Sequence, residues 1–486
     1  PFEQAKNVRL HYEGIMAVLV RNGAEEMCGV RNLKGCVLMS IFLLGMACTA
    51  ASGRTIYVDY DGLADFSNIQ AAIDDSNDGD TIIVADGIYT GDGNRDIDFL
   101  GKAITLRSEN GPENCIIDCN GTNTDPHRGF YFHNGEDSNS VLDGFTITNG
   151  LANDLIVPFG GAIHGNGTKA TIQNNHIVGN VALTYNFFSG VRGGGLYDCD
   201  GTIQYNIISG NSAVNIDLLS LSTGGGLYGC DGTIKNNIIS NNIADFGGGI
   251  EFRSSNPIIS GCVFSGNIAY SQGGGVFCYG DSPTFINCTF NRNNATYHGG
   301  GFYNCSNIIT ILTNCTFIGN SATYGGGIFN YSDSELNLIN CILWSNTPDQ
   351  IYGDSPTLTY SDVQGVWPGL GNIDDDPCFA DVKNGDYHLK SQAGRWEPSS
   401  QSWLEDNVTS PCIDAGNPMS PIGLEPFPNG GRINMGAYGG TTEASKSYFG
   451  QPVCETIVAG DINGDCKVNF LDFRIMAFHW LRDENK

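Results

Sequence analysis

The sequence predicts an all-β solenoid in which short parallel strands stack coil upon coil, a parallel β-helix. Three observations lead to this prediction. Glycine supplies 66 of 486 residues, glycine clusters recur at a nearly fixed spacing, and the segments between them are rich in Ile, Val, Phe and Thr without a helical period. A unit of about 26 residues cannot bury its own apolar side chains, so it must stack on its neighbours.

The glycine clusters set the register of the predicted coils. Each cluster closes on an apolar residue, and these residues are Ile163, Leu196, Leu227, Ile250, Val276, Phe302 and Ile328. The steps between them are 33, 31, 23, 26, 26 and 26 residues. Glycine is expected where the chain turns sharply or where two backbones pass closely.

Two further columns lie between the clusters. One is asparagine, at Asn180, Asn211, Asn242, Asn267, Asn293, Asn320 and Asn346. The other stands three residues earlier and is large and apolar, at Ile177, Ile208, Ile239, Phe264, Phe290, Phe317 and Leu343. Stacking at the strand spacing of about 4.8 Å places equivalent residues over one another. We therefore predict an interior apolar stack and a ladder of asparagine amides at a bend.

The amino end has the features of a processed leader. Residues 1–26 precede Met27 and are interpreted as a mis-set upstream start. Residues 27–51 are a predicted signal peptide, with charged residues, a short apolar run and a small-residue cleavage site. The sequence therefore predicts a secreted or extracellular protein, with attachment to the cell surface as an alternative. No later segment is apolar enough to predict a transmembrane anchor.

The charge balance restricts the partners. There are 24 Lys and Arg against 52 Asp and Glu, a net charge of −28. Nucleic acids and anionic membranes require a basic face, so neither is a predicted partner.

The repeats resemble a known group of proteins. The pairing of Phe264-Ser265-Gly266-Asn267 with a glycine cluster resembles the polymorphic outer membrane protein repeats of right-handed parallel β-helix proteins. Segments near both ends are similar to secreted bacterial β-helices of the pectin-lyase-like superfamily, where a short amphipathic helix caps the first coil. These segments are 55–59, 69–89, 386–389, 410–416 and 431–440. The resemblance implies a right-handed parallel β-helix over residues 54–445 and leaves activity open, because this scaffold hosts lyases, hydrolases, adhesins and binding proteins.

A calcium-loop pattern follows a predicted linker at 446–458. Oxygen-bearing positions of the loop are Asp461, Asn463, Asp465, Lys467, Asn469 and Asp472, with the Lys467 position matching the backbone-carbonyl ligand of such loops. Residues 459–486, with a helix expected over 473–480, resemble one dockerin type I repeat, which implies calcium and a cohesin-like protein partner. Cys466 replaces the usual glycine and only one repeat is present. An acidic tail without metal is the alternative.

Candidate chemistry is sparse. Asp200 and Asp231 recur at a turn, together with Asp281 and Asp333, and are the catalytic candidates. Solvated turn residues are the alternative. His164 and His298 adjoin glycine turns and are predicted to lie on the surface. The cysteine column at Cys262, Cys288, Cys315 and Cys341 is predicted to be buried thiols, because stacked coils hold the thiols slightly too far apart for a disulfide.

An aromatic column provides candidate ligand-binding residues. It is predicted one residue past the cluster-closing positions at Tyr197, Tyr228, Phe277, Tyr303 and Phe329, and two residues past Ile250 at Phe252. Facing outward, these rings would stack on sugars; facing inward, they would belong to the core.

The leading hypothesis is a secreted or cell-surface β-helix that binds a polysaccharide, a cell-surface glycan or another extracellular surface component, with a calcium-binding tail for attachment. The alternatives are a polysaccharide lyase or glycoside hydrolase, and a purely adhesive or structural solenoid.

Overall fold

The computed structural model describes residues 53–62, 64–185, 190–216, 221–253, 256–280, 282–305, 309–331, 334–450, 460, 462 and 467–483. Residues 53–486 form one compact unit. The predicted upstream start and signal peptide lie outside the described residues.

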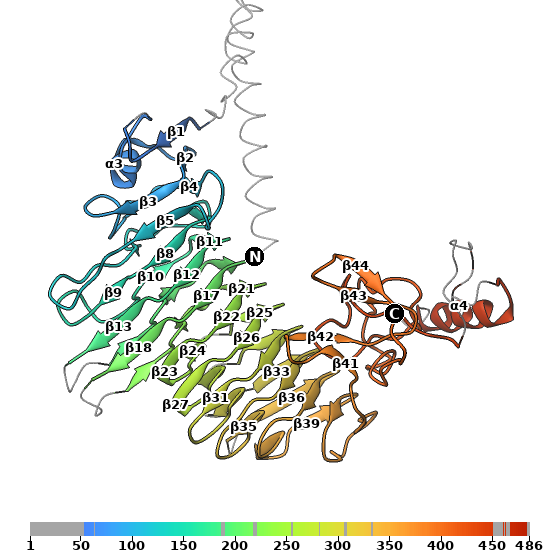
Figure 1. Ribbon diagram of the computed structural model, residues 1–486. Coiled ribbons are helices and arrows are strands. Elements are labelled where there is room, and N and C mark those ends of the chain that lie inside the picture. Colours follow the sequence, from blue (N-terminus) through green and yellow to red (C-terminus); the bar gives the residue numbers. More distant parts are fainter. Residues whose placement is uncertain are drawn as a thin grey trace, which may run out of the picture. The chain divides into compact units, whose positions relative to one another are not determined.

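The chain winds through four parallel sheets, which we call A, B, C and D. Each complete coil contributes strands to sheets A, B, D and C in that order (Figure 1). Sheet A comprises β1 (Thr55–Val58), β2 (Thr81–Val84), β4 (Thr105–Ser108), β7 (Val141–Asp143), β11 (Thr171–Gln173), β16 (Thr202–Gln204), β21 (Thr233–Lys235), β25 (Ile258–Ser260), β29 (Thr284–Ile286), β33 (Ile309–Thr313), β36 (Glu335–Ile339) and β39 (Thr357–Thr359). Sheet B comprises β3 (Gly87–Thr90), β5 (Cys115–Asp118), β8 (Thr146–Thr148), β12 (His176–Val178), β17 (Ile207–Ser209), β22 (Ile238–Ser240), β26 (Val263–Ser265), β30 (Thr289–Asn291), β34 (Thr316–Ile318), β37 (Ile342–Trp344) and β40 (Asp362–Val363).

Sheets C and D form the other side of the coils. Sheet C comprises β6 (Phe130–Tyr131), β10 (Ile163–Thr168), β15 (Leu196–Cys199), β20 (Leu227–Tyr228), β24 (Ile250–Arg253), β28 (Val276–Tyr279), β32 (Phe302–Cys305), β35 (Ile328–Asn330) and β38 (Ile351–Gly353). Sheet D comprises β9 (Leu151–Ala152), β13 (Val181–Thr184), β14 (Val191–Arg192), β18 (Ser212–Asn215), β19 (Ser222–Thr223), β23 (Ile243–Phe246), β27 (Ile268–Gln272) and β31 (Asn294–Ala295).

Strand pairing confirms the predicted register. Leu196 pairs with Leu227, and Ile250 pairs with Val276, so residues that close successive glycine clusters lie over one another. Every strand pairing in these four sheets is parallel and joins strands one coil apart. At one step, β18 and β19 of one coil both pair with β23 of the next coil. The protein is therefore a parallel β-helix, as its repeats predict.

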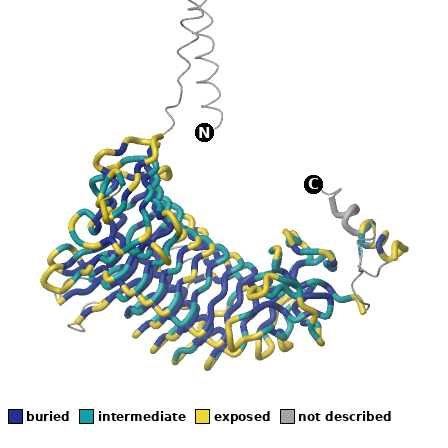
Figure 2. The backbone as a smooth tube through the Cα atoms, turned by 45° about the horizontal axis from the view of Figure 1, so that its top comes forward, coloured by how far each residue is buried: buried dark blue, intermediate teal, exposed yellow. Residues whose placement is uncertain are grey.

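The core is a column of apolar side chains inside the coils. All seven residues of the predicted apolar column are fully buried. The rings of Phe264 and Phe290 stack at 4.7 Å, and those of Phe290 and Phe317 at 4.3 Å. Figure 2 shows buried residues running along the strands and exposed residues collecting at turns and loops.

The asparagine ladder is also confirmed. The Asn180 amide nitrogen donates to the Asn211 side-chain oxygen at 3.0 Å, and the same bond repeats down to Asn346 at 2.8 to 3.1 Å. All seven side chains are buried, so the amides satisfy one another where water is excluded.

Glycine clusters form the corner between sheets D and C. Gly193 has a φ of +64°, a conformation that residues with a Cβ rarely adopt. A Cβ on Gly194 would lie 2.4 Å from the carbonyl oxygen of Gly225 in the next coil. Gly193 therefore supplies the positive φ of a sharp turn, and Gly194 allows two backbones to pass closely, as the sequence predicts.

A short helix caps the first coil. Helix α3 (Ile69–Asp75) begins after Asn68, whose side chain accepts from the Ala71 amide, and it buries Ile69, Ala72 and Ile73 against the first strands. This is the amphipathic capping helix that the resemblance implies.

The parallel coils end earlier than the predicted boundary at residue 445. After β40 the chain forms two antiparallel hairpins, β41 (Phe379–Asp381) with β42 (Asp386–Leu389), and β43 (Arg395–Glu397) with β44 (Ser402–Leu404). The following chain covers the outer face of sheet B, where Ile318 and Ile342 are buried in a second core with Met435. Residues 364–447 are therefore a closing segment that shields the last coils, because the outer face of sheet B is apolar there.

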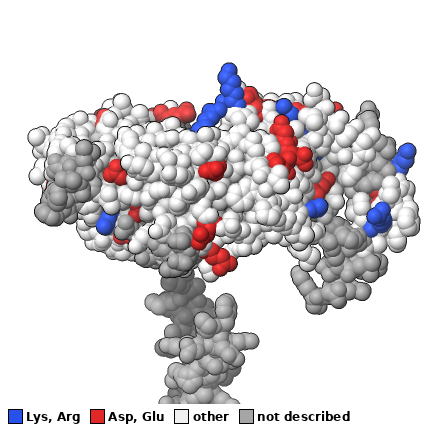
Figure 3. Space-filling model, turned by 90° about the horizontal axis from the view of Figure 1, so that it is seen from below, with Lys and Arg blue, Asp and Glu red and all other residues white. Residues whose placement is uncertain are grey.

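The tail contains helix α4 (Phe470–Asp483), which starts three residues before the expected helix. No helix in the described part of the chain is long and apolar enough to cross a membrane. In the view of Figure 3, Lys, Arg, Asp and Glu are scattered over a mostly uncharged face.

Candidate ligand-binding face

The outer face of sheet C carries a continuous column of side chains. Strand pairing places one member on each coil: Tyr131, His164, Tyr197, Tyr228, Glu251, Phe277, Tyr303, Phe329 and Tyr352. Five of the six predicted aromatic residues belong to this column. Phe252 does not: it is fully buried in the core, and Glu251 occupies the column on that coil.

The rings of this column are less accessible than the sequence suggested. Tyr228, Phe277, Tyr303 and Phe329 are only 5 to 8% exposed. Phe277 and Tyr303 stack at 5.1 Å with nearly parallel planes, and Tyr303 and Phe329 stack at 5.3 Å. Most ring faces are therefore covered by the next ring, so this part of the column offers little surface to a sugar.

A second column lies beside it on sheet D, just before each glycine corner. Its members, joined by parallel bridges, are Phe159, Arg192, Thr223, Phe246, Gln272, His298 and Tyr324. His298 contacts the Phe329 ring at 4.4 Å and stacks on Tyr324 at 5.6 Å, so it belongs to this face.

The two columns meet in a group that we call the arginine–aromatic cluster. It consists of Arg128, Tyr131, His133, Phe159, His164, Arg192, Tyr197 and Tyr228. Ring centroids of Phe159 and Tyr197 are 4.8 Å apart, those of Tyr131 and His164 are 5.0 Å apart, and those of His164 and Tyr197 are 4.9 Å apart. Residues from separate coils thus form one continuous surface.

Arg192 is the cation at the centre of the cluster. Its guanidinium carbon lies 5.2 Å from the Phe159 ring centroid and 5.1 Å from that of Tyr228, within range of a cation–π interaction with both. Burial raises the pKa of Tyr197, so this phenol stays protonated at neutral pH. Arg192 is held by rings and remains partly exposed.

Arg128 is buried beneath the surface of the cluster and stabilises it through hydrogen bonds. It is 4% exposed, and its Nη1 donates to His164 Nδ1 at 2.7 Å while Nη2 donates to the carbonyls of Ile156 and Val157 at 3.2 Å. An arginine only donates, so His164 Nδ1 must accept and its proton sits on Nε2. The bonds of Arg128 to Ile156 and Val157 fix the loop that carries Phe159, whose ring centroid lies 6.5 Å from that of His164.

The structure corrects the sequence prediction for His164. It is 8% exposed rather than a surface turn residue. Burial, and then the charge of Arg128, lowers its pKa to about 4, so the ring is neutral at pH 7. Its place one residue past the cluster-closing Ile163 is the signal that marks it as a column member.

The acidic turn lies at the far end of β15. The Asp231 amide donates to Asp200 Oδ1 at 3.1 Å, and Lys169 Nζ lies 3.3 Å from Asp200 Oδ2, so the two catalytic candidates do come together. Asp198, which sequence reasoning missed, joins them: burial and the charges of Asp200 and Asp231 raise its pKa. Asp281 and Asp333 lie outside the described residues.

Three of the calcium-loop positions, Asp461, Asn463 and Asp465, lie outside the described residues. Of the rest, Asp472 is 2% exposed and its carboxylate accepts from the amides of Ile462 and Asn469, both at 2.7 Å. Lys467 is exposed. Within the part of the chain that the structure describes, no group of three His, Cys, Asp or Glu residues converges as a metal site.

Cysteines have a packing role in this fold. Every cysteine of the described residues is a free thiol. In the predicted column, Cys288 Sγ donates to the carbonyl of Ile286 at 3.4 Å, and the other three make the same local contact.

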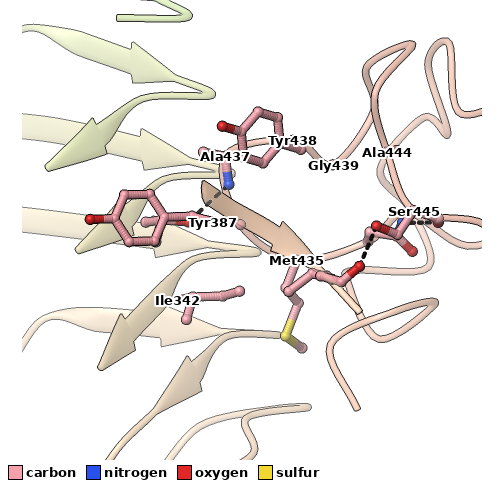
Figure 4. A pocket seen from close by; sticks show the side chains of 12 residues that line it. Ile342, Tyr387, Met435, Ala437, Tyr438, Gly439, Ala444 and Ser445 are labelled. Carbon is pink, nitrogen blue, oxygen red and sulfur yellow. Dashed lines mark hydrogen bonds between the residues drawn. The ribbon is translucent and has the colours of Figure 1, made fainter. Parts of the chain in front are cut away.

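The cavities lie elsewhere. A cavity of about 10 Å³, the room of a single water, sits in the seam where Ile342 meets Tyr387 and Met435 of the closing segment (Figure 4). An open hollow of about 490 Å³ near the first coil is lined by Tyr57, Asp59 and Glu109 among others. The small cavity beside Ile342 is a packing gap between the last coils and the closing segment, so neither its volume nor its position suits a glycan.

Comparisons with known proteins add limited information. The family described as "Disaggregatase related" matches residues 307–416, less than half of the chain. Among solved structures, the crystal structure of pectate lyase Pel9A aligns with 80% of this chain and 96% of that one, at 13% identity and a TM-score of 0.36. No curated protein matches the chain. The β-helix assignment accordingly rests on the observed parallel sheets.

Proposed function

We propose that this protein is an extracellular β-helix that binds a polysaccharide or cell-surface glycan on the arginine–aromatic cluster. The observation that carries the proposal is the convergence of partly exposed rings and hydrogen-bonding groups on one surface. Tyr131 is 37% exposed, and Phe159, Tyr197 and Arg192 are partly exposed beside it. Sugars present apolar C–H faces together with hydroxyl edges, and a ring surface with a few fixed polar groups complements both.

Polysaccharide breakdown is the second candidate function. It is supported by the acidic turn, since a carboxyl of raised pKa beside further carboxylates is the arrangement that glycoside hydrolysis uses. Asp198 has the raised pKa, and Asp200 and Asp231 are its neighbours. Asp198 directly follows Tyr197 on β15, so a glycan on the cluster would pass near this turn. The lyase form of this proposal would use an arginine as the base. Of the two arginines in the cluster, Arg192 is the accessible one.

The tail is proposed as the attachment module. The loop pattern from Asp461 to Asp472 supports calcium binding there, followed by docking of α4 to a cohesin-like protein. The exposed side chains of Phe470, Phe473 and Met476 support such docking, since they form an uncovered apolar surface. The signal-peptide pattern supports secretion, which brings the protein to extracellular glycans.

Chromatographic sizing separates these functions. The chain from residue 52 onward is incubated with neutral and acidic polysaccharides, in calcium and in chelator. Co-elution of intact glycan with the protein supports the binding function, and shortened chains support the enzyme. Phe159→Ala should weaken co-elution, whereas the control Tyr270→Ala, an exposed ring on sheet D, should not. If neither effect occurs with any glycan, the adhesive or structural alternative stands and the proposal is wrong.

A further inference from the structure

We infer that the chain cleaves its own backbone between Asp125 and Pro126, without a protease. This activity is independent of the proposed glycan binding. The sequence contains two Asp–Pro bonds, Asp125–Pro126 and Asp376–Pro377. An Asp–Pro bond is a weak backbone amide, because the aspartate side chain can attack its own carbonyl carbon in a five-membered ring while the prolyl nitrogen leaves as a basic amine. The surroundings of the two bonds show which of them is arranged for this reaction.

The loop that contains the first bond holds the reacting carbonyl in a fixed position. This loop joins β5 to β6, and Thr122 and Asp125 are hydrogen-bonded across it in both directions. The Thr122 amide donates to the Asp125 carbonyl at 2.8 Å, and the Asp125 amide donates to the Thr122 carbonyl at 3.2 Å and to its hydroxyl at 3.1 Å. The Asp125 carbonyl is the one that the side chain attacks. A donor already aimed at its oxygen stabilises the negative charge that develops there.

A histidine beside the bond supplies the proton that the leaving nitrogen needs. His127 Nε2 lies 3.1 Å from Asp125 Oδ1, within ion-pair distance but outside hydrogen-bond geometry. Its Nδ1 lies 2.5 Å from Asp96 Oδ2, which fixes the ring. Carboxylate oxygens only accept, so a ring between two of them can carry a proton on each nitrogen. His127 is therefore the catalytic acid, and Asp96 is a positioning residue.

The second Asp–Pro bond has different surroundings. Asp376 Oδ1 accepts from the Cys378 amide at 2.9 Å, so its carboxylate is held by the backbone. In the described part of the chain, the histidines within ion-pair distance of a carboxylate contact other acids than Asp376. The same chemical bond thus occurs once with a neighbouring imidazole and once without, which makes Asp376–Pro377 an internal control.

The reaction balances with water as the only co-reactant. An Asp125 carboxylate oxygen bonds to the Asp125 carbonyl carbon, the bond from that carbon to the Pro126 nitrogen breaks, and His127 Nε2 gives its proton to that nitrogen. The products are a five-membered cyclic anhydride and a new chain that begins at Pro126. Water reaches the anhydride, because the Asp125 side chain is 67% exposed, and opens it to two carboxylates. Of the two protons released, one returns to His127 and the other goes to the Pro126 amine.

The fold keeps both cut ends in place. On one side of the bond the Gly121 amide donates to the Asn149 carbonyl at 2.9 Å, and on the other the His127 carbonyl accepts from the Leu151 amide at 2.7 Å. Strands β5 and β6 keep their parallel partners β8 and β10 on the next coil. We therefore expect two chains in one folded particle, which separate only on denaturation.

The test uses the chain from residue 52 onward, incubated with protease inhibitors at neutral and mildly acidic pH. Mass spectrometry after denaturation should show fragments 52–125 and 126–486, whose masses sum to that of the chain plus one water. His127→Ala should lower the rate constant about 100-fold, and free imidazole should restore part of it. Asp96→Asn should slow cleavage and move the pH–rate profile to lower pH, because the imidazole loses a negative charge that favours its protonated form. Asp376→Asn, the matched control, should leave the rate unchanged.

Four results would each overturn the inference. They are an uncleaved wild-type chain, equal cleavage at both Asp–Pro bonds, a rate in folded His127→Ala equal to that of the wild type, and unchanged cleavage in urea, where the loop is not assembled. The urea comparison needs no variant, so it decides the matter even if His127→Ala does not fold. A rate constant that is the same at all protein concentrations supports an intramolecular step, and one that rises with concentration would assign the cut to a contaminating protease and overturn the inference.

Discussion

Replacing Asn267 by alanine should destabilise the β-helix far more than its small change in volume suggests. Its side-chain oxygen accepts from both the backbone and the side-chain nitrogen of Asn242 at 3.0 Å, and its nitrogen donates to Asn293 Oδ1 at 2.9 Å and to the Ile239 carbonyl at 2.8 Å. The variant removes the Asn267 oxygen that accepts from the backbone and side-chain nitrogens of buried Asn242. It also removes the donor to the buried Ile239 carbonyl. Each orphaned group costs about 1–3 kcal/mol, so we expect a loss of about 4 kcal/mol.

Asn294→Ala is the matched control. Asn294 follows the ladder residue of the next coil, is exposed, and makes one side-chain bond to the Ser321 hydroxyl at 2.8 Å. Its replacement should cost about 0.5 kcal/mol or less. Urea unfolding followed by circular dichroism should show a lower midpoint for Asn267→Ala at unchanged slope. A difference between the two variants below about 0.5 kcal/mol would refute the claim that the amide ladder stabilises the coils.

Three further predictions concern other parts of the chain. Burial raises the pKa of Asp362 to about 7, so the folded state holds a proton that the unfolded state releases near pH 4, and stability should fall as pH rises from 4 to 7 by at most about 4 kcal/mol. Burial also raises the pKa of Glu425 to about 7, so Asp362→Asn should remove only the share of that slope due to Asp362, in melting temperatures measured between pH 4 and pH 8. An unchanged slope would assign all of it to other groups. Gly248→Ala places a Cβ 2.5 and 2.6 Å from carbonyl oxygens of Ile268 and Gly274 and should cost about 3 kcal/mol in urea unfolding; a neutral result would show that the corner can open. Mutating Asp461 and Asp465 together to alanine should abolish calcium binding by the tail in calorimetry, and an unchanged calcium affinity would contradict the metal-loop proposal.

The fold was predictable because its repeats impose their chemistry on every coil. The asparagine ladder requires the same residue at each level, since each amide both donates and accepts along the stack. The interior column tolerates Ile, Phe or Leu because only apolar volume matters there. Such requirements are visible in a single sequence as columns at a fixed spacing.

The site was less predictable because it depends on distant contacts. In the column, the regular spacing points to Glu251, one residue past the closing Ile250, but an aromatic pattern favours Phe252. Strand pairing places Glu251 in the column, and Phe252 is buried in the core. Arg128 precedes the first glycine cluster and meets His164 across 36 residues, a contact that no local pattern encodes.

The closing segment shows a similar limit. The resemblance to β-helix proteins implies coils up to residue 445, whereas the chain after β40 forms antiparallel hairpins. The segment is held through long-range bonds, such as those from the Asn314 side chain to the carbonyls of Asn434 and Gly436 at 2.9 and 3.2 Å. Bonds of this kind leave no period in the sequence.

Hydrogen–deuterium exchange with and without saturating polysaccharide tests the central claim most directly, because it locates the bound glycan on the fold. Our account predicts slower exchange of the backbone amides in residues 153–160 and around Arg192, with no change at the turns between sheets A and B near Asn206 and Asn237. Protection confined to those turns, or no protection near Arg192 while glycan is bound, would contradict the assignment of the arginine–aromatic cluster as the binding site.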